Sequence, residues 1–407
     1  MTKKSDAPAI RFKGFSDAWE QRKLGDIADI VGGGTPSTGN QSYWDGDIDW
    51  YAPAEIADQI YANSSQKKIT GLGYENSSAK MLPPGTVLFT SRAGIGKTAI
   101  LTRKGCTNQG FQSIVPHRGE LDSYFIFSRT EELKRYGELV GAGSTFVEVS
   151  GKQMAVMELM MPPTMREQQT IGGFFQQLDH LITLHQRKFE KLTNVKKSML
   201  EKMFPQNGSS YPEIRFKGFT DPWEQRKVGD LLIERNQQAP MSDEYPLMAF
   251  IANEGVAPKG ERYDRSALVT DTVNKLYKKT EKGDFIYSSN NLETGSIGLN
   301  KYGKACISPV YSIFEPTGIA DSDFLGRRLV RKDFINAMVK WRQGVIYGQW
   351  RIHESDFLKI EIPVPSVEEQ RKIGAYLDQL DNLITLHQRE LEKLQNIKKS
   401  MLEKMFV

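Results

Sequence analysis

Apolar residues recur at alternating three- and four-residue intervals along two long stretches of the chain, 167–204 and 369–407. This spacing is typical of a helix that buries one apolar stripe against a partner helix. It predicts two long antiparallel helices that form a coiled-coil spacer. The two seam histidines occupy matching positions, where a polar residue that fixes the register is a simpler interpretation than a metal ligand. We expect the seam to contain Leu178, Leu181, His185, Leu192, Leu380, Leu383, His387 and Leu394.

The chain contains an internal repeat. This repeat indicates the fold more directly than any single helix or strand. The segment 167–204 returns at 369–406 with eleven of thirty-eight positions changed, and both copies end in KKSMLEKMF. An entry motif, IRFKGFSDAWEQRKLGDI at 10–27, returns at 214–231 with four of eighteen positions changed. The segments between motif and helix have nearly equal lengths but share little sequence. The chain is therefore two copies of one plan, which predicts a pseudo-twofold arrangement.

Both variable segments have the pattern of strands joined by loops. Runs of β-branched and aromatic residues, such as GTVLFTS at 85–91 and GDFIYSS at 283–289, lie between Gly, Pro and Asn clusters. Cys106 and Cys306 occupy matching strands and are interpreted as small core residues. We predict an α+β fold class with two globular domains separated by the two helices. The expected divisions are 1–166, the helix 167–204, a linker 205–213, 214–368, and the helix 369–407.

Composition adds few constraints. The 407 residues contain 54 Lys and Arg against 50 Asp and Glu, a mild excess that permits a nucleic-acid partner without requiring one. Two cysteines distant in sequence indicate neither a disulfide framework nor a metal knuckle. We expect a soluble cytoplasmic protein, because the sequence shows no apolar signal region and no run of the roughly 20 apolar residues that a membrane span requires.

Two motifs suggest chemistry, but neither is complete. Gly96, Lys97 and Thr98 in GIGKT match the end of a phosphate-binding loop, yet the leading glycine is Ser91 and the second copy lacks the lysine. Asp45, Asp47 and Asp49 in WDGDIDW could bind a cation, although solvated loop carboxylates are the simpler interpretation. The sequence has no nucleophile elbow for a hydrolytic triad and no Asn/Asp-Pro-Pro-aromatic loop for amino methylation. We expect no catalytic residues and no metal site.

These residues resemble the specificity subunit of type I restriction-modification systems. The resemblance lies in GGGTPST, YWDGDIDWYAPAEI, GTVLFTSRAGIGKTAIL, TNQGFQSIVP and the EQ…I…LD.LI entry to each helix, and it spans essentially the whole chain. It implies a non-catalytic subunit whose two target recognition domains each recognise one half of an asymmetric bipartite double-stranded DNA target. It further implies two methylation subunits that use S-adenosylmethionine for adenine-N6 methylation, and motor-nuclease subunits that use ATP and Mg. A nucleotide-dependent enzyme and a coiled-coil protein adaptor remain the alternatives.

The base-contacting residues are hypotheses drawn from side-chain chemistry. Arg and Lys bind guanine edges or phosphates, while Asn and Gln pair with adenine. A solvated surface role is the alternative for each residue. The candidates are Arg92, Lys97, Arg103, Lys104, Gln109 and Gln112 in the first domain, and Asn290, Asn291, Lys301, Tyr347, Gln349 and Arg351 in the second.

The repeated entry motif predicts a partner interface. A segment kept nearly identical in both copies cannot specify two different half-sites, and its mixture of Arg, Lys, Phe and Trp suits a protein interface. Packing of the aromatic residues on the helices is the alternative. The candidates are Phe12, Phe15, Trp19, Phe216, Phe219 and Trp223.

Overall fold

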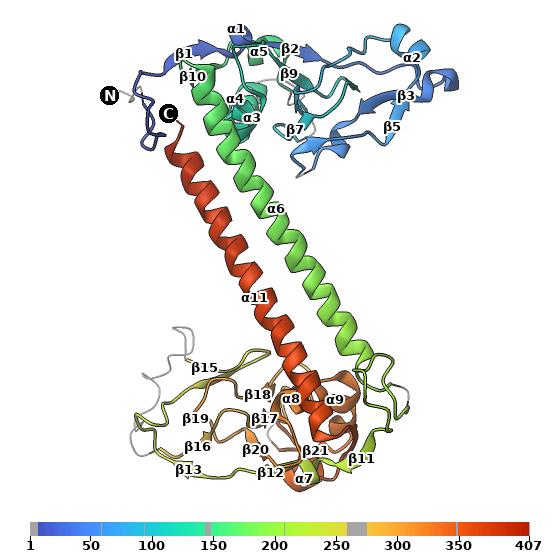
Figure 1. Ribbon diagram of the computed structural model, residues 1–407, viewed down its shortest axis with the longest axis vertical. Coiled ribbons are helices and arrows are strands. Elements are labelled where there is room, and N and C mark those ends of the chain that lie inside the picture. The colour runs from blue at the N-terminus through green and yellow to red at the C-terminus, as the bar shows by residue number, and fades with distance from the viewer. Residues whose placement is uncertain are drawn as a thin grey trace. The chain divides into compact units, whose positions relative to one another are not determined.

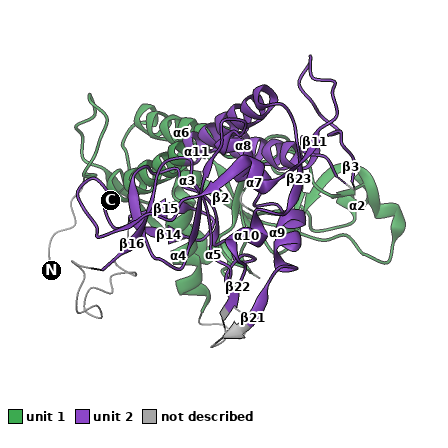
Figure 2. Cartoon of the chain, turned by 90° about the horizontal axis from the view of Figure 1, so that it is seen from below, with its two compact units in different colours: residues 1–186, 389–407 green, residues 187–388 purple. Residues whose placement is uncertain are grey.

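The computed structural model describes residues 7–406 apart from 58, 93, 143–147, 207, 259–274 and 347–348. Tyr347, one of the candidate DNA contacts, therefore lies outside the described residues. The chain divides into two compact units (Figure 2). Unit 1 combines residues 1–186 with 389–407, and unit 2 consists of residues 187–388. In the described part of the chain, no helix has the length and apolar content that a bilayer span requires.

Each of the two predicted helical stretches forms one helix, α6 at Met165–Lys202 and α11 at Val367–Lys404. In unit 1 the beginning of α6 packs antiparallel against the end of α11, as the green and red ribbons show (Figure 1). In unit 2 the end of α6 packs against the beginning of α11. Lys398 pairs with Asp179 at 2.5 Å in unit 1, and Lys196 pairs with Asp381 in unit 2. These four residues are repeat equivalents, so the same contact forms in both units.

The predicted seam is partly wrong. Leu178 and Leu380 are buried, and Leu192 and Leu394 pack against the cores of units 2 and 1. Leu181 and Leu383, by contrast, are 40% and 37% exposed. The half-buried positions are instead Ile182 and Ile384, one residue later, and His185 and His387 are also half-buried. Positions 178, 182 and 185 follow a four-then-three spacing, as in a coiled-coil stripe.

Unit 1 is built on a five-stranded sheet in the order β2-β9-β6-β7-β4, beside a three-stranded sheet, β5-β3-β8. Most strand pairs are antiparallel, but β3–β8 and β4–β7 are parallel. Short helices cover the larger sheet, and β1 pairs with β10 where the chain enters and leaves the domain. The elements are β1 Glu20–Lys23, α1 Leu24–Ile27, β2 Ala28–Gly32, η1 Gln41–Tyr43, β3 Trp44–Tyr51, η2 Pro53–Glu55, β4 Tyr61–Ala62, β5 Lys67–Ile69, α2 Gly71–Glu75, β6 Val87–Phe89, β7 Thr98–Leu101, β8 Cys106–Thr107, β9 Gln112–Pro116, α3 Ser123–Ser128, α4 Thr130–Gly141, α5 Gly151–Ala155 and β10 Glu158–Met161.

Unit 2 repeats this plan with a four-stranded sheet, β12-β20-β17-β18, and a three-stranded sheet, β13-β16-β19. The ribbon β11–β23 is the counterpart of β1–β10. Cys106 and Cys306 are both fully buried in matching strands, which confirms their assignment to the core. The elements are β11 Glu224–Lys227, α7 Val228–Leu231, β12 Leu232–Glu234, β13 Gln238–Ala239, β14 Ala249–Ile251, β15 Gly255–Ala257, β16 Tyr277–Thr280, β17 Phe285–Tyr287, β18 Ile297–Leu299, β19 Ala305–Ile307, β20 Ser312–Pro316, α8 Ser322–Arg328, α9 Lys332–Val339, β21 Gln343–Ile346, β22 Gln349–Arg351, α10 Glu354–Phe357 and β23 Glu361–Val364.

The repeated ending KKSMLEKMF completes the core of the domain that belongs to the other repeat. In unit 2, Phe204 stacks on Phe324 with ring centroids 5.5 Å apart and meets the edge of Trp223 at 6.1 Å. In unit 1, Phe406 stacks on Phe175 at 5.7 Å and meets the edge of Trp19 at 6.4 Å. Each domain core is therefore closed by a helix end supplied from elsewhere in the sequence.

Substitution Phe204→Ala tests this dependence. Phe204 is 1% exposed in the core of unit 2, and removal of such a ring costs about 3–5 kcal/mol through lost burial and the cavity left behind. We expect amides of β17 and α8 to exchange hydrogen much faster in the variant, measured by native-state hydrogen exchange. Leu386→Ala is the matched control, since Leu386 is 52% exposed on α11 of the same unit and its truncation costs at most about 0.5 kcal/mol. Equal effects of the two changes would contradict the assignment.

Candidate nucleic-acid interface

In unit 1, two loops meet beyond the end of β6. The backbone N–H of Val149 donates to the carbonyl of Ser91 at 3.0 Å, and Arg92 and Glu148 form an antiparallel bridge. The guanidinium of Arg92 lies 3.7 Å from the Glu148 carboxylate, and both side chains are more than a third exposed. We call Ser91, Arg92, Glu148 and Val149 the loop edge of unit 1. It presents a cation and an anion side by side to solvent.

Unit 2 has the equivalent arrangement at the end of β17. The Oγ of Ser289 accepts the backbone N–H of Ile352 at 3.0 Å, and the Oδ1 of Asn290 accepts that of Trp350 at 2.6 Å. Ser289 and Asn290 are the sequence counterparts of Ser91 and Arg92. We call Ser289, Asn290, Trp350, Arg351 and Ile352 the loop edge of unit 2. Its exposed side chains include Trp350, 44% exposed, and Arg351, 67% exposed.

Two predicted glutamines lie near the loop edge of unit 1. The Ser91 N–H donates to the carbonyl of Gly110 at 2.8 Å, which brings the turn that carries Gln109 next to Arg92. Gln109 hydrogen-bonds Thr35. Gln112 sits against Gly151, where a Cβ would lie 2.9 Å from its Oε1. The structure thus brings Arg92, Gln109 and Gln112 to one end of the sheet.

The other candidates lie elsewhere or are already paired. Arg103 and Lys104 are exposed in the turn after β7, at the opposite end of that strand from the exposed Lys97. The guanidinium of Arg103 lies 2.5 Å from Asp49. Lys301 lies 2.8 Å from Asp378 on α11, so it joins the sheet to the helix. Asn291 is exposed beside the loop edge of unit 2, and the side chain of Gln349 lies outside the described atoms.

Asp49 is a structural carboxylate, not part of a cation site. It is 2% exposed, lies 2.8 Å from the Lys68 ammonium, and accepts hydrogen bonds from Ser65. Burial pushes the pKa of Asp49 upward, but the bonds from Lys68, Ser65 and Arg103 outweigh burial and lower the pKa well below its usual range. The carboxylate is therefore held in its charged form.

Substitution Asp49→Asn should show the corresponding pH dependence. A carboxyl whose folded pKa is lowered contributes stability above its unfolded pKa of about 4, and this contribution disappears as the pH falls toward the folded value. We expect Asp49→Asn to lower the thermal unfolding temperature at pH 7, with a smaller difference at about pH 3. The exposed Asp47→Asn is the control and should leave the unfolding temperature unchanged at both pH values. A constant difference for Asp49→Asn across this range would contradict the charge-based account.

Two amides of the GIGKT loop, those of Gly96 and Lys97, are already hydrogen-bonded within the protein. The N–H of Gly96 donates to the carbonyl of Thr90 at 3.0 Å, and the N–H of Lys97 donates to the Thr90 hydroxyl at 2.9 Å. Gly96 has φ +95°, and a Cβ there would lie 2.9 Å from the Lys134 Cα and closer still to its side chain. The glycines allow a tight turn packed on α4, whereas a phosphate-binding loop directs its amides at the ligand.

The predicted partner interface needs correction at its two tryptophans. Trp19 and Trp223 are 3% and 2% exposed, because each fills a domain core against a helix end. Phe12 packs edge-on against Phe174, and Phe216 packs in the same way against Tyr376. Phe15 and Phe219 are half-buried, with the Lys372 ammonium 4.7 Å from the Phe219 ring centre. The two tryptophans therefore pack in the domain cores, which was the alternative to a partner interface.

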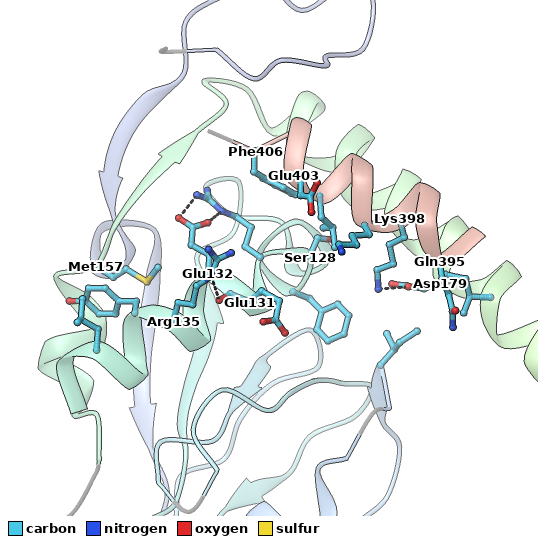
Figure 3. Close-up of a pocket in the computed structure, with 18 of the residues that line it drawn as sticks. Ser128, Glu131, Glu132, Arg135, Met157, Asp179, Gln395, Lys398, Glu403 and Phe406 are labelled. Carbon is cyan, nitrogen blue, oxygen red and sulfur yellow. Dashed lines mark hydrogen bonds and ion pairs between the residues drawn. The ribbon is translucent and has the colours of Figure 1, made fainter. Parts of the chain in front are cut away.

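A groove of about 1110 Å³ in unit 1 lies between α4 and the end of α11 (Figure 3). Two ion pairs lie in it, Asp179 with Lys398 and Glu132 with Arg129 at 2.7 Å. The Ser128 hydroxyl donates to the Tyr124 carbonyl at 2.7 Å and not to a general base. The residues that line this groove offer no nucleophile–base pair. Among the described residues, no group of His, Cys, Asp and Glu side chains could hold a metal ion.

Sequence reasoning missed Glu148, Trp350 and the pair formed by Arg342 and Glu293. Arg342 donates two hydrogen bonds to Glu293, both at 2.6 Å, and lies 5.9 Å from the centre of the Trp350 ring. This pairing lowers the pKa of Glu293, chiefly through the hydrogen bonds from Arg342. No local motif connects residues 49 positions apart. Only the alignment of Ser91 with Ser289 could have indicated where the two loop edges lie.

Two copies of one mixed α and β domain, with different side chains exposed at matching loops, define the chain as a duplicated-domain protein. The sequence pattern of the type I restriction modification DNA specificity domain matches residues 16–194 and again residues 220–396. The chain belongs to this family and contains its domain twice.

Known relatives agree with this assignment. The chain is 32% identical over 237 residues to the type I restriction enzyme MjaIX specificity subunit of Methanocaldococcus jannaschii, in a match that covers 56% of this chain and about half, 55%, of that relative. It is 24% identical over 409 residues to the putative MjaX specificity subunit of the same organism, which covers 94% of this chain and 92% of the relative. The crystal structure of a type I restriction-modification S subunit from M. genitalium has the same fold, with a TM-score of 0.59, 14% identity, and coverage of 98% of this chain and 99% of that one.

Proposed function

We propose that this chain is the non-catalytic specificity subunit of a type I restriction-modification complex. Unit 1 and unit 2 each bind one half of an asymmetric bipartite target in double-stranded DNA. The observation that carries the proposal is the pair of matching loop edges, in each of which a backbone N–H is bound by a serine at the same position but different side chains are exposed. Equivalent frames with different donors and acceptors suit two different base sequences.

The paired helices α6 and α11 would set the separation between the half-sites. A helix of 38 residues is roughly 57 Å long at 1.5 Å per residue. Duplex DNA rises 3.4 Å per base pair, so this length corresponds to at most about 17 base pairs. The matching ion pairs of Asp179 with Lys398 and of Asp381 with Lys196 support a pseudo-twofold relation between the two halves.

Catalysis belongs to partner subunits in this proposal. Two methylation subunits would bind S-adenosylmethionine, and motor-nuclease subunits would bind ATP and Mg. The repeated segments support two equivalent partner sites, because they present nearly the same residues twice. Cytoplasmic location follows from the DNA target.

The two alternatives have less support. A nucleotide-dependent enzyme built on GIGKT would need the amides of Gly96 and Lys97, and Thr90 occupies both. A coiled-coil adaptor that binds only proteins would not need two domains that share one fold but differ in sequence. A DNA target with two unlike halves would require two such domains.

Methylation mapping tests the proposed function. When this chain is expressed with a type I methylation subunit in cells that lack other adenine methylation, we expect N6-methyladenine at one bipartite sequence with unlike halves. Cells that express the methylation subunit alone are the control. Absence of any sequence-specific methylation, with an intact complex recovered from the same cells, would contradict the proposal.

Substitution Arg92→Ala tests the interface in unit 1. Loss of one guanidinium contact should weaken methylation of the cognate site roughly 5- to 150-fold, the range of one good base contact. The half-exposed side chain contributes little to the core, so the thermal unfolding temperature should stay unchanged. Lys80→Ala, which removes an exposed positive charge of unit 1 at a position with no predicted DNA contact, is the matched control. DNA affinity equal to that of the unsubstituted complex would exclude Arg92 from the interface.

A further inference from the structure

The two loop edges are built in a similar way. In each, the N–H of a fully buried residue donates to a serine that follows a strand: Val149 to the Ser91 carbonyl after β6, and Ile352 to the Ser289 hydroxyl after β17. Successive residues of an extended segment point to opposite faces. Burial of Val149 and Ile352 therefore directs Glu148 and Arg351, the residues before them, toward solvent. Positions 148 and 351 are structural equivalents with opposite charge.

Arg351 projects from a backbone that is held at several points. Asn290 and Ser289 accept the N–H groups on either side of it, and Tyr287 donates its hydroxyl to the Ile352 carbonyl at 3.3 Å. The ion pair of Arg342 with Glu293 holds the start of the same hairpin. A side chain on such a fixed backbone can impose hydrogen-bond geometry on a ligand, because little ordering is needed on binding.

The guanidinium of Arg351 is also largely available. It is 67% exposed, and its contact with Glu354 spans 3.9 Å, which is longer than a hydrogen bond. Glu354 itself accepts a hydrogen bond from Ser312 at 2.7 Å. In unit 1 the equivalent Glu148 is an acceptor, with Arg92 beside it at 3.7 Å. The two edges therefore offer a forked donor and an acceptor at the same place in the fold.

We propose that positions 148 and 351 determine half-site specificity. Arg351 donates two hydrogen bonds to the O6 and N7 atoms of a guanine in the half-site bound by unit 2, and Glu148 accepts from the amino group of a cytosine in the half-site bound by unit 1. These pairings follow from the donors and acceptors that each base presents in the major groove. Asn290 acts as a positioning residue, because it holds the backbone from which Arg351 projects. The inference rests on the proposed function.

Substitution Arg351→Glu tests the determinant. Methylation is assayed with the assembled complex on a library of targets randomised in both halves. We expect the preference for guanine at one position of the second half-site to fall roughly 5- to 150-fold and cytosine to be favoured there, with the first half-site unchanged. Lys282→Ala removes an exposed positive charge at the far end of β17 and should leave both preferences intact.

Two results would overturn the inference. One is an unchanged target for Arg351→Glu; the other is an equal loss on all sequences, which is the behaviour of a phosphate contact. If Arg351→Glu abolishes methylation, Arg351→Lys is the variant that tests the inference. Lysine keeps the positive charge but lacks the forked pair of N–H donors of the guanidinium. This variant should methylate the same sites with weaker discrimination at that one position, because lysine can contact guanine without the fork; an equal loss on all sequences would again overturn the inference.

Asn290→Ala tests the positioning role. It should relax the preference at the same base of the second half-site, whereas a merely structural role would lower the unfolding temperature without changing any base preference. The outcomes are separable from failure of the proposed function itself. In that case the unsubstituted complex would direct no sequence-specific methylation, and the variants would have no target to change.

Discussion

The architecture depends on the ends of two helices. Each end is buried in the core of the domain that belongs to the other repeat. Phe204 closes the core of unit 2 against Phe324 and Trp223, and Phe406 closes the core of unit 1 against Phe175 and Trp19. A backbone hydrogen bond fixes each end, from Ile214 to Lys202 and from Ile10 to Lys404, both at 2.9 Å. Each tryptophan also meets a ring of its own repeat, Trp19 against Phe125 and Trp223 against Phe324, and the helix end of the other repeat completes the cover.

This constraint explains why the repeat is so uneven. The entry motif and the helices face each other across the same core: Arg11 pairs with Glu167 in unit 1 and Arg215 with Glu369 in unit 2. A change on either side would leave a buried charge or a cavity, which costs several kcal/mol. The variable segments also contact the helices, for example through the hydrogen bond of Tyr124 to Asp179 and the ion pair of Arg327 with Asp378. Packing therefore accounts for the near-identity of the entry motifs and helices, and the divergence of the variable segments lies in their other surfaces.

Features that repeat along the chain, or that recur at a fixed spacing, could be predicted from the sequence. Contacts between residues that are far apart in the sequence could not. The helices, the strands around the matched cysteines and the two-domain plan follow from periodicity and self-similarity. The burial of Ile182 in place of Leu181 does not, because both are apolar neighbours and only the packing against α11 distinguishes them. Trp19 was expected at a surface because its covering helix end lies almost four hundred residues away. Arg103 was a candidate DNA contact because its partner, Asp49, has no local signal.

The loop edges show how such a fold can change its ligand without losing stability. The bonds that hold Val149 and Ile352 join backbone N–H groups to the Ser91 carbonyl and the Ser289 hydroxyl, so they place no demand on the side chains of Glu148 and Arg351. Glu148 and Arg351 can differ in charge while Val149 and Ile352 remain buried. Substitution at an exposed position costs little in folding but alters the donors offered to a base. Specificity can therefore diverge between two domains whose cores must stay compatible with the same helix ends.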